Sequence, residues 1–271
     1  MAEFIRIDRR IFLVRLSKGA LAMAVLGACA DDSSSTTRSS TTSGTTRSST
    51  TSGTTATSGA STSSTVGASS TTGAAGTAQF VRIPIDFVSA YLVVRGSEAA
   101  VVDTGVAGSE GAIEAGLGEV GLDWAAVGHV ILTHHHPDHV GSLSAVMDAA
   151  AQATGYVGQG DIDNVNGPRE LTAVAEGEEI FGLQVIATPG HTAGHISLFD
   201  SAASVLVAGD ALNGGGVGVE GPNPQFSEDH QQALATVSKM AGFEYETLYF
   251  GHGDPVMGGA SGLVAELAAS L

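Results

Sequence analysis

The chain has 271 residues, of which 28 are acidic and 11 are basic, and its formal net charge at pH 7 is −17. Beyond residue 79 the only basic side chains are Arg82, Arg95, Arg169 and Lys239, so this part of the chain is strongly acidic. Because such a surface repels phosphate backbones, we expect no nucleic-acid partner and no strongly anionic substrate.

Residues 1–28 are expected to form an export signal rather than part of the fold. Basic residues precede an apolar run at 19–28, which as a helix would rise about 15 Å, half of a bilayer core. The segment 8–13, Asp-Arg-Arg-Ile-Phe-Leu, resembles the twin-arginine export motif, and the segment 26–29, Leu-Gly-Ala-Cys, resembles a lipobox. These resemblances imply that Cys29, the only cysteine, receives lipid and anchors the exported protein to the membrane.

Residues 30–78 consist almost wholly of Ser, Thr, Gly and Ala, and the stretch 38–46 repeats without change at 47–55. Such a segment has nothing to bury, so we expect a disordered tether. A flexible chain of this length spans roughly 40 Å root mean square, which would hold a catalytic domain at 79–271 away from the membrane.

From residue 79 the sequence alternates between strand and helix patterns. Short apolar runs at 91–94 and 99–102 predict two strands joined by a tight turn, and Ser109 can cap a helix that ends near residue 117. Further strands are expected at 129–133, 183–188, 195–199, 205–208 and 247–250, and further helices at 139–153, 227–240 and 262–270. Periodicity alone indicates an α/β fold, and the alternation with hairpins fits a four-layer αββα sandwich.

The segment 133–139, Thr-His-His-His-Pro-Asp-His, lies where an expected buried strand ends and a helix begins. Loops at the carboxyl ends of strands are where α/β proteins bind ligands. His134 and His136 can converge on one metal ion, whereas Asp138 and His139 begin the next turn and can reach a second ion. His135 is expected to face solvent or to pack against the fold.

Three further candidate ligands follow apolar strands: His191, Asp210 and His252. Each has glycine neighbours, which let the backbone approach an ion closely. We expect His195 to have a supporting or structural role. We expect the glycines at 214–216 to form an active-site loop rather than a phosphate loop, and the pocket to be lined by loops 104–110, 155–170 and 211–227.

The patterns His-x-His-x-Asp-His, Gly-His-x-x-Gly-His, Gly-Asp and Gly-His-Gly, in this order, resemble the metallo-β-lactamase superfamily and especially its glyoxalase II-like branch. The resemblance covers nearly all of residues 80–255. It implies one ion held by His134, His136 and His191, a second held by Asp138, His139 and His252, and Asp210 as the bridge between them. It also implies that Asp103 supports a ligand from behind.

The resemblance implies two divalent ions, with Zn²⁺ as the default and Fe or Mn as alternatives. A hydroxide shared by the ions would attack an ester, thioester, lactone or related bond of a small-molecule substrate, and Asp138 would act as the catalytic residue that orients it. Two other functions remain open: a persulfide dioxygenase-like enzyme with one iron, and a non-catalytic metal-binding surface lipoprotein. The sequence does not determine the oligomeric state.

Two departures from the family pattern bear on the substrate. Subclass B1 lactamases use a Cys ligand where this chain has Asp210, so penicillin is a disfavoured substrate. Glyoxalase II carries a C-terminal helical domain for its glutathione thioester, whereas only 19 residues follow His252 here. We therefore expect hydroxyacylglutathione to be disfavoured as well.

Overall fold

The computed structural model describes residues 77–216 and 218–271. The expected export signal at 1–28, Cys29, and all but the last two residues of the expected tether lie outside the described residues. Within the two described ranges, no helix combines the length and the apolar character needed to cross a membrane.

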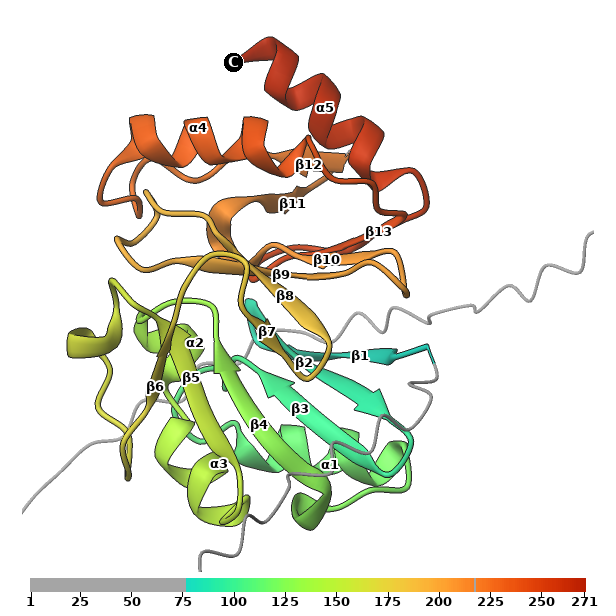
Figure 1. The fold of residues 1–271 in the computed structure, drawn as a ribbon, viewed down its shortest axis with the longest axis vertical. Helices are drawn as coiled ribbons and strands as arrows, with labels where there is room; N and C mark the ends of the chain where they lie inside the picture. The colour runs from blue at the N-terminus through green and yellow to red at the C-terminus, as the bar shows by residue number, and fades with distance from the viewer. Residues whose placement is uncertain (1–76, 217) are drawn as a thin grey trace, which may run out of the picture. The chain divides into compact units, whose positions relative to one another are not determined.

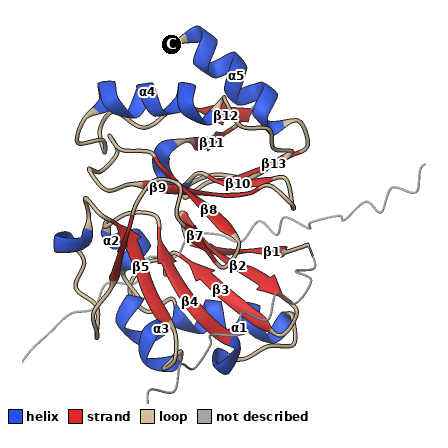
Figure 2. Ribbon diagram, viewed as in Figure 1, coloured by secondary structure: helices blue, strands red, loops and turns tan. Residues whose placement is uncertain are grey.

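Two six-stranded sheets form the centre of the fold, as Figures 1 and 2 show. The first sheet has the order β1-β2-β3-β4-β5-β6, in which β1 to β3 pair antiparallel and β3 to β6 pair parallel. Its strands are β1 (Gln79–Ile85), β2 (Val88–Arg95), β3 (Glu98–Val102), β4 (Val127–Leu132), β5 (Thr154–Gly158) and β6 (Thr172–Val174).

The second sheet has the order β14-β13-β10-β9-β8-β7, and only its β10–β13 pair is parallel. Its strands are β7 (Glu179–Ile180), β8 (Leu183–Ala187), β9 (Ile196–Asp200), β10 (Val205–Val207), β13 (Thr247–Tyr249) and β14 (Val256–Met257). A separate ribbon pairs β11 (Asn213–Gly215) with β12 (Gly218–Glu220).

Helices cover the outer face of each sheet (Figure 2). The helices of the described ranges are α1 (Glu110–Glu119), α2 (Pro137–Val140), α3 (Leu143–Ala149), α4 (His230–Met240) and α5 (Ala260–Ser270), with short 3-10 helices η1 (Trp124–Ala126), η2 (Ile162–Asn164) and η3 (Gly209–Ala211). The α1 and α3 helices lie on the first sheet, and α4 and α5 lie on the second. The arrangement is the expected αββα sandwich.

Three buried apolar clusters fill the spaces between these layers. One lies between the first sheet and its helices, one between the two sheets, and one between the second sheet and α4 and α5. Strand β2 shows how the sequence achieves this: Leu92 points into the first cluster, while Tyr91 and Val93 point into the second. Since successive side chains of a strand face opposite sides, a strand that is covered on both faces is apolar throughout.

The single helix expected over 139–153 is wrong, because the structure has α2 and α3 with a break between them. A Cβ on Gly141 would lie 2.6 Å from Pro137 O and 2.7 Å from Val106 C, so the backbone is held tightly against the loop after β3. Gly141 N donates to Gly105 O instead of continuing one helix. Contacts distant in sequence thus override the helical pattern.

Two smaller expectations are also wrong. The helix expected at 227–240 begins only at His230, because Asp229 caps α4: its Oδ1 accepts from Gln232 N at 3.0 Å, whereas Ser227 donates to Asn223 O. The first two glycines of the expected loop at 214–216 belong to β11, and Gly214 N donates to His252 O. This ribbon therefore packs directly against the segment that carries His252.

Candidate metal centre

The seven predicted ligands meet in three overlapping groups, in each of which the potential ligand atoms lie within 4.8 Å of one another. The groups are His134, His136 and His191; His134, His139 and Asp210; and Asp138, His139 and His252. Each side chain comes from a segment that follows β4, β8, β10 or β13. Strands far apart in the sequence therefore deliver their terminal residues to one place.

The first group is arranged as three ligands of one ion would be. His191 Nε2 lies 3.2 Å from His134 Nε2 and 2.9 Å from His136 Nδ1. Neutral ring nitrogens repel each other at such distances unless a cation or a proton lies between them. Ligands held tetrahedrally at about 2.0–2.1 Å from Zn²⁺ are about 3.3 Å apart, so the separations fit a single ion.

Asp210, at the start of η3, lies between the two metal sites that the sequence predicts. Its Oδ2 is 3.4 Å from His191 Nε2 and 3.2 Å from His252 Nε2, and its Oδ1 is 3.4 Å from His139 Nε2. Asp138 Oδ2 completes the second site at 3.3 Å from His252 Nε2. The Asp210 carboxylate thus faces the histidines of both sites, as a bridging ligand must.

Two buried atoms at the centre support this interpretation. Within the described part of the chain, His139 Nε2 and Asp210 Oδ1 face each other at 3.4 Å, and neither makes a hydrogen bond. A buried polar atom without a partner costs about 1–3 kcal/mol, so the arrangement is unfavourable unless these atoms are otherwise engaged. Coordination of a cation would satisfy both atoms, and a His and Asp donor set suits Zn, Fe or Mn. The residues present therefore fit a pair of metal ions.

The pKa values divide the histidines into two classes. Burial holds the pKa of His134 well below its usual range and lowers the pKa of His191 to about 4. Burial also disfavours the charged form of His252, but hydrogen bonds to Asp138 and Asp210 outweigh it and raise its pKa to about 10. For His139, burial is likewise outweighed by Asp210 and Asp103, which hold its pKa well above the usual value.

Hydrogen bonds behind the ligands fix their orientation. Asp103 Oδ2 lies 2.9 Å from His139 Nδ1, and the same carboxylate accepts from Thr133 N and Thr133 Oγ1 at 2.7 and 2.8 Å. Asp103 occupies the supporting position that the resemblance implies, and it adopts a left-handed φ of 58°, a strained conformation for a residue other than glycine. His252 Nδ1 donates to Phe87 O at 2.8 Å, which directs Nε2 toward the carboxylates.

His195 supports Asp210 from behind. Its Nε2 accepts from Asp210 N at 3.0 Å, and its Nδ1 lies 2.7 Å from Thr188 Oγ1. Burial holds the pKa of His195 well below the usual value, so the ring stays neutral and can accept this bond. Gly209, with φ of 57°, is required here, because a Cβ would lie 2.7 Å from His195 Nε2.

Asp161 is a buried residue of the site that no pattern in the sequence indicates. Its carboxylate accepts from His135 N at 3.1 Å, from Thr192 Oγ1 at 2.6 Å and from Gly194 N at 2.7 Å. It therefore joins the loop after β4 to the loop after β8, which together carry the first metal site. His135 is half-buried beside Asp161, with Nδ1 3.1 Å from the carboxylate, rather than directed to solvent.

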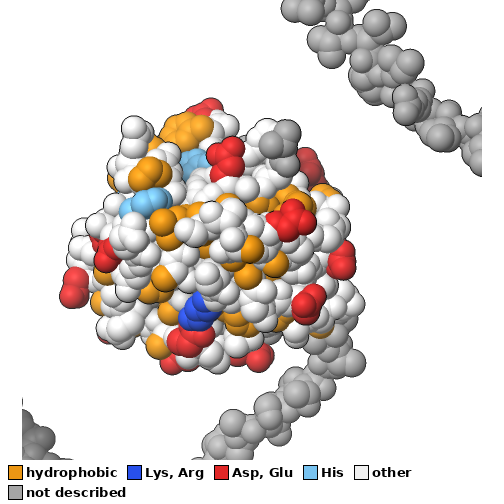
Figure 3. Space-filling view, turned by 90° about the horizontal axis from the view of Figure 1, so that it is seen from above, with side chains coloured by type: hydrophobic (Ala, Val, Ile, Leu, Met, Phe, Trp, Pro, Cys, Tyr) orange, Lys and Arg blue, Asp and Glu red, His pale blue; other side chains and the backbone are white. Residues whose placement is uncertain are grey.

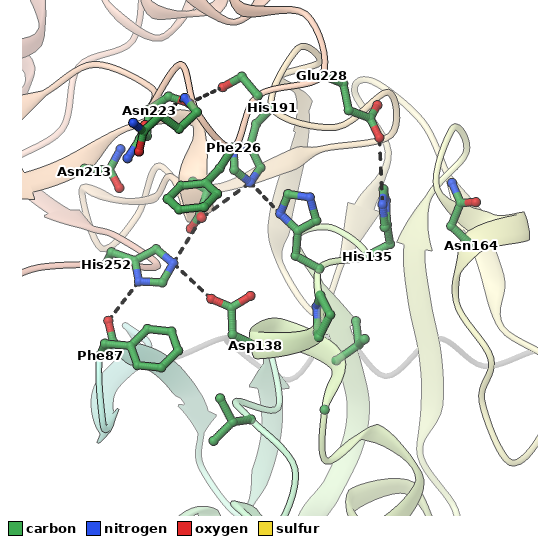
Figure 4. Close-up of a pocket in the computed structure, with 18 of the residues that line it drawn as sticks. Phe87, His135, Asp138, Asn164, His191, Asn213, Asn223, Phe226, Glu228 and His252 are labelled. Carbon is green, nitrogen blue, oxygen red and sulfur yellow. Dashed lines mark hydrogen bonds and ion pairs between the residues drawn. The ribbon is translucent and has the colours of Figure 1, made fainter.

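A cavity of about 1320 Å³ opens over the metal centre. His136, Asp138, His191, Asp210 and His252 lie on its wall (Figure 4). The three loops expected to form the pocket all contribute, and Phe87, from the turn between β1 and β2, joins them unpredicted. The centre is thus accessible to a small molecule.

Comparison with known proteins places these features in a family. The family model described as the metallo-beta-lactamase superfamily matches residues 83–159 and 147–252. Uncharacterized protein YobT of Bacillus subtilis (strain 168) is 29% identical over 196 residues, which cover 61% of this chain and 83% of that protein. Hydroxyacylglutathione hydrolase of Acidiphilium cryptum (strain JF-5) is 37% identical over 168 residues, which cover 58% of this chain and 64% of that enzyme.

Less than two thirds of the length of that hydrolase is therefore matched. Among solved structures, that of TTHA1623 in a di-iron-bound form is similar with a TM-score of 0.58 and 23% identity, over 71% of this chain and 100% of that chain. At this identity the likeness concerns the fold alone. Since the family model spans both sheets and every residue of the histidine and aspartate groups, the chain belongs to the metallo-beta-lactamase superfamily, a superfamily that binds metal ions.

Proposed function

We propose that the protein is a hydrolase that depends on two divalent metal ions and cleaves an ester, thioester, lactone or related bond of a small molecule. The observation that supports this most is the position of Asp210, whose carboxylate faces the histidines of both sites beneath an open cavity. When bound, such ions supply a water of lowered pKa and polarise the carbonyl oxygen of a substrate.

Asp138 is the proposed catalytic residue. It is half-buried on the cavity wall, with Oδ2 3.3 Å from His252 Nε2. Burial raises the pKa of Asp138, but the hydrogen bond with His252 and the charges of His139 and His252 together outweigh it, and the net shift is downward. The carboxylate is therefore ionised at neutral pH and can orient a water and hold its proton.

The first group and the Asp138 group favour two ions over one. A persulfide dioxygenase-like enzyme would need only one iron with two His and one carboxylate, and would leave the second group without a role. Zn²⁺ is the proposed metal, and Fe and Mn are the alternatives that suit the same His and Asp donors. The hydroxyacylglutathione hydrolase relative supports hydrolysis of a thioester-like bond.

Metal analysis combined with a hydrolytic screen tests the proposal. The full-length protein is expected to bind two metal ions per chain and to cleave members of an ester, thioester and lactone panel. In Asp210→Asn and His136→Ala, metal content should fall and turnover should drop by more than about a hundredfold, since loss of residues that merely support a ligand already costs 10–100-fold. His129→Ala, a histidine that packs against Tyr156 and Phe181, serves as the control.

Normal metal content and turnover in both ligand variants would contradict the proposal. Two bound ions without turnover of any compound on the panel would favour the metal-binding lipoprotein. One iron per chain with oxygen uptake would favour the dioxygenase.

A further inference from the structure

Exposed aromatic rings line one side of the cavity. Phe87 and Phe226 are 65% and 63% exposed, and both lie near His252 in Figure 4. The Phe87 ring stacks on the His252 ring with centroids 5.8 Å apart. Exposed apolar side chains that gather at a cavity, rather than singly on the surface, mark a place where apolar groups bind.

No lysine or arginine in the described ranges lines this cavity. The four basic side chains of those ranges make contacts elsewhere: Arg82 with Asp254 and Gly253 O, Arg95 with Asp200, Arg169 with the carbonyls of Ala150 and Ala153, and Lys239 with Glu176. On the face shown in Figure 3, acidic side chains are spread over the surface and basic ones are scarce. A carboxylate at the far end of a substrate, away from the metal centre, would find no lysine or arginine here.

The side of the cavity near His135 carries a negative charge, which would repel such a carboxylate. Glu228 lines this side, with Oε1 3.8 Å from His135 Nε2 and Oε2 accepting from Ala193 N at 2.9 Å. Figure 4 shows Glu228 and Asn164 together on this side of the centre. Apart from the candidate metal ligands and His135, the polar groups that remain on the wall are neutral: the Ser227 hydroxyl and the amides of Asn164, Asn166, Asn213, Asn223 and Gln225.

We propose that the cavity selects substrates whose acyl chain is uncharged and apolar, with that chain lying against Phe226 and Phe87, and that it rejects acyl chains that end in a carboxylate. The apolar wall favours burial of methylene groups, whereas a terminal carboxylate would lose hydration, meet no cation and approach Glu228. The inference rests on the proposed hydrolase, because it names the substrate class of the same metal centre.

Hydroxamates share one metal-binding group, so differences in their affinity report the contacts of the acyl chain rather than the binding of the metal. Calorimetry on the full-length, zinc-loaded protein would compare acetohydroxamate, octanohydroxamate and the monohydroxamate of octanedioic acid. The last two differ only in the far end of the chain, a methyl group against a carboxylate. We expect octanohydroxamate to bind at least about tenfold more tightly than either of the other two.

Variants connect this preference to named residues. Phe226→Ala should weaken octanohydroxamate by about five- to tenfold and leave acetohydroxamate unchanged. Glu228→Gln, which keeps an oxygen for Ala193 N, should strengthen the octanedioic compound severalfold at low salt. Met257→Ala is the matched control, because Met257 is 67% exposed but lies on β14 outside the cavity, and it should change none of the three affinities.

Equal affinity for the two long hydroxamates, or full affinity of Phe226→Ala for octanohydroxamate, would overturn the inference. If turnover of the ester panel persists in that case, the proposed hydrolase stands and only the acyl preference fails. If the affinities follow the expectation but no ester, thioester or lactone is cleaved, the hydrolase fails and the apolar site stands. Failure of all three hydroxamates to bind would overturn both.

Discussion

The histidines of the metal centre differ in their protonation state before a metal binds. His134, His136 and His191 have lowered pKa values, with burial as the main cause, and are neutral at pH 7. His139 and His252 have raised pKa values, that of His252 about 10, because nearby carboxylates outweigh burial. In the proposed two-ion arrangement, the first site can therefore take a cation without losing protons, whereas the second must lose protons first.

This difference predicts a pH dependence of metal binding. A group with a raised pKa still holds its proton at pH 7, so filling the second site should release about one to two protons and its affinity should fall as pH decreases. Calorimetry of Zn²⁺ binding in buffers with different ionisation enthalpies measures this release. The first ion should bind with much less proton release, and the same release for both ions would contradict the assignment.

Asp161 gives a second prediction at this scale. Asp161→Ala leaves the buried donors Thr192 Oγ1 and Gly194 N without their acceptor, so the free energy of unfolding of the metal-free protein should fall by roughly 2–5 kcal/mol. Zinc affinity should fall too, because the two loops of the first site lose their connection. Asp163→Ala, in the same turn but exposed, is the control for urea unfolding and zinc titration. Indistinguishable results for the two variants would refute the role of Asp161.

The candidate ligands stand out in the sequence, but Asp161 and Phe226 do not. His134 and Asp138 lie in a dense motif, and Asp210 directly follows an apolar strand, so local sequence marks them. Asp161 is one acidic residue in a loop, and its partners at 135 and 192–194 come near it only after both sheets form. Phe226 likewise becomes part of the cavity wall only when its loop folds over the metal centre, so the sequence alone does not indicate this position.

Among the elements, the sequence predicts seven of the fourteen described strands and the helices α1, α4 and α5, but it does not predict β1 or β5. The buried runs at β3, β4, β8, β9, β10 and β13 are short, apolar and rich in β-branched residues, so their positions agree with expectation within a few residues. Edge strands β6, β7 and β14 have two or three residues each and too little pattern to be recognised. The prediction of one helix over 139–153 is wrong because Gly141 packs against the loop after β3 and the helix is interrupted there.

The loop after β13 supports a prediction at the scale of elements. A Cβ at Gly251 would overlap Asp210 Oδ1 and lie 2.7 Å from His139 Cε1, although the backbone there is not left-handed. Gly251→Ala should therefore push the β13 loop away and abolish binding of the second ion, as measured by metal content. Gly262→Ala, in α5 with no atom within 4 Å of its Cβ, should bind two ions and be unchanged or stabilised by up to about 1 kcal/mol. Retention of two ions by Gly251→Ala would show that the loop tolerates the displacement.

The packing of the two sheets in the domain determines where the metal centre lies. Apolar clusters hold the two sheets together, and the segments after β4, β8, β10 and β13 bring their polar residues to one site. The αββα architecture was predictable because the motif order resembles one family, whereas the exact pairing of strands depends on packing between the sheets. Export, lipid on Cys29 and the tether at 30–78 stay predictions, because those residues lie outside the described part of the chain.

The central claim is that these side chains hold two cations with Asp210 between them. Anomalous diffraction at the zinc edge from crystals of the zinc-loaded protein tests it most directly. We expect two peaks about 3.5–4 Å apart, one beside His134, His136 and His191 and the other beside Asp138, His139 and His252. A single peak, or peaks remote from Asp210, would contradict it.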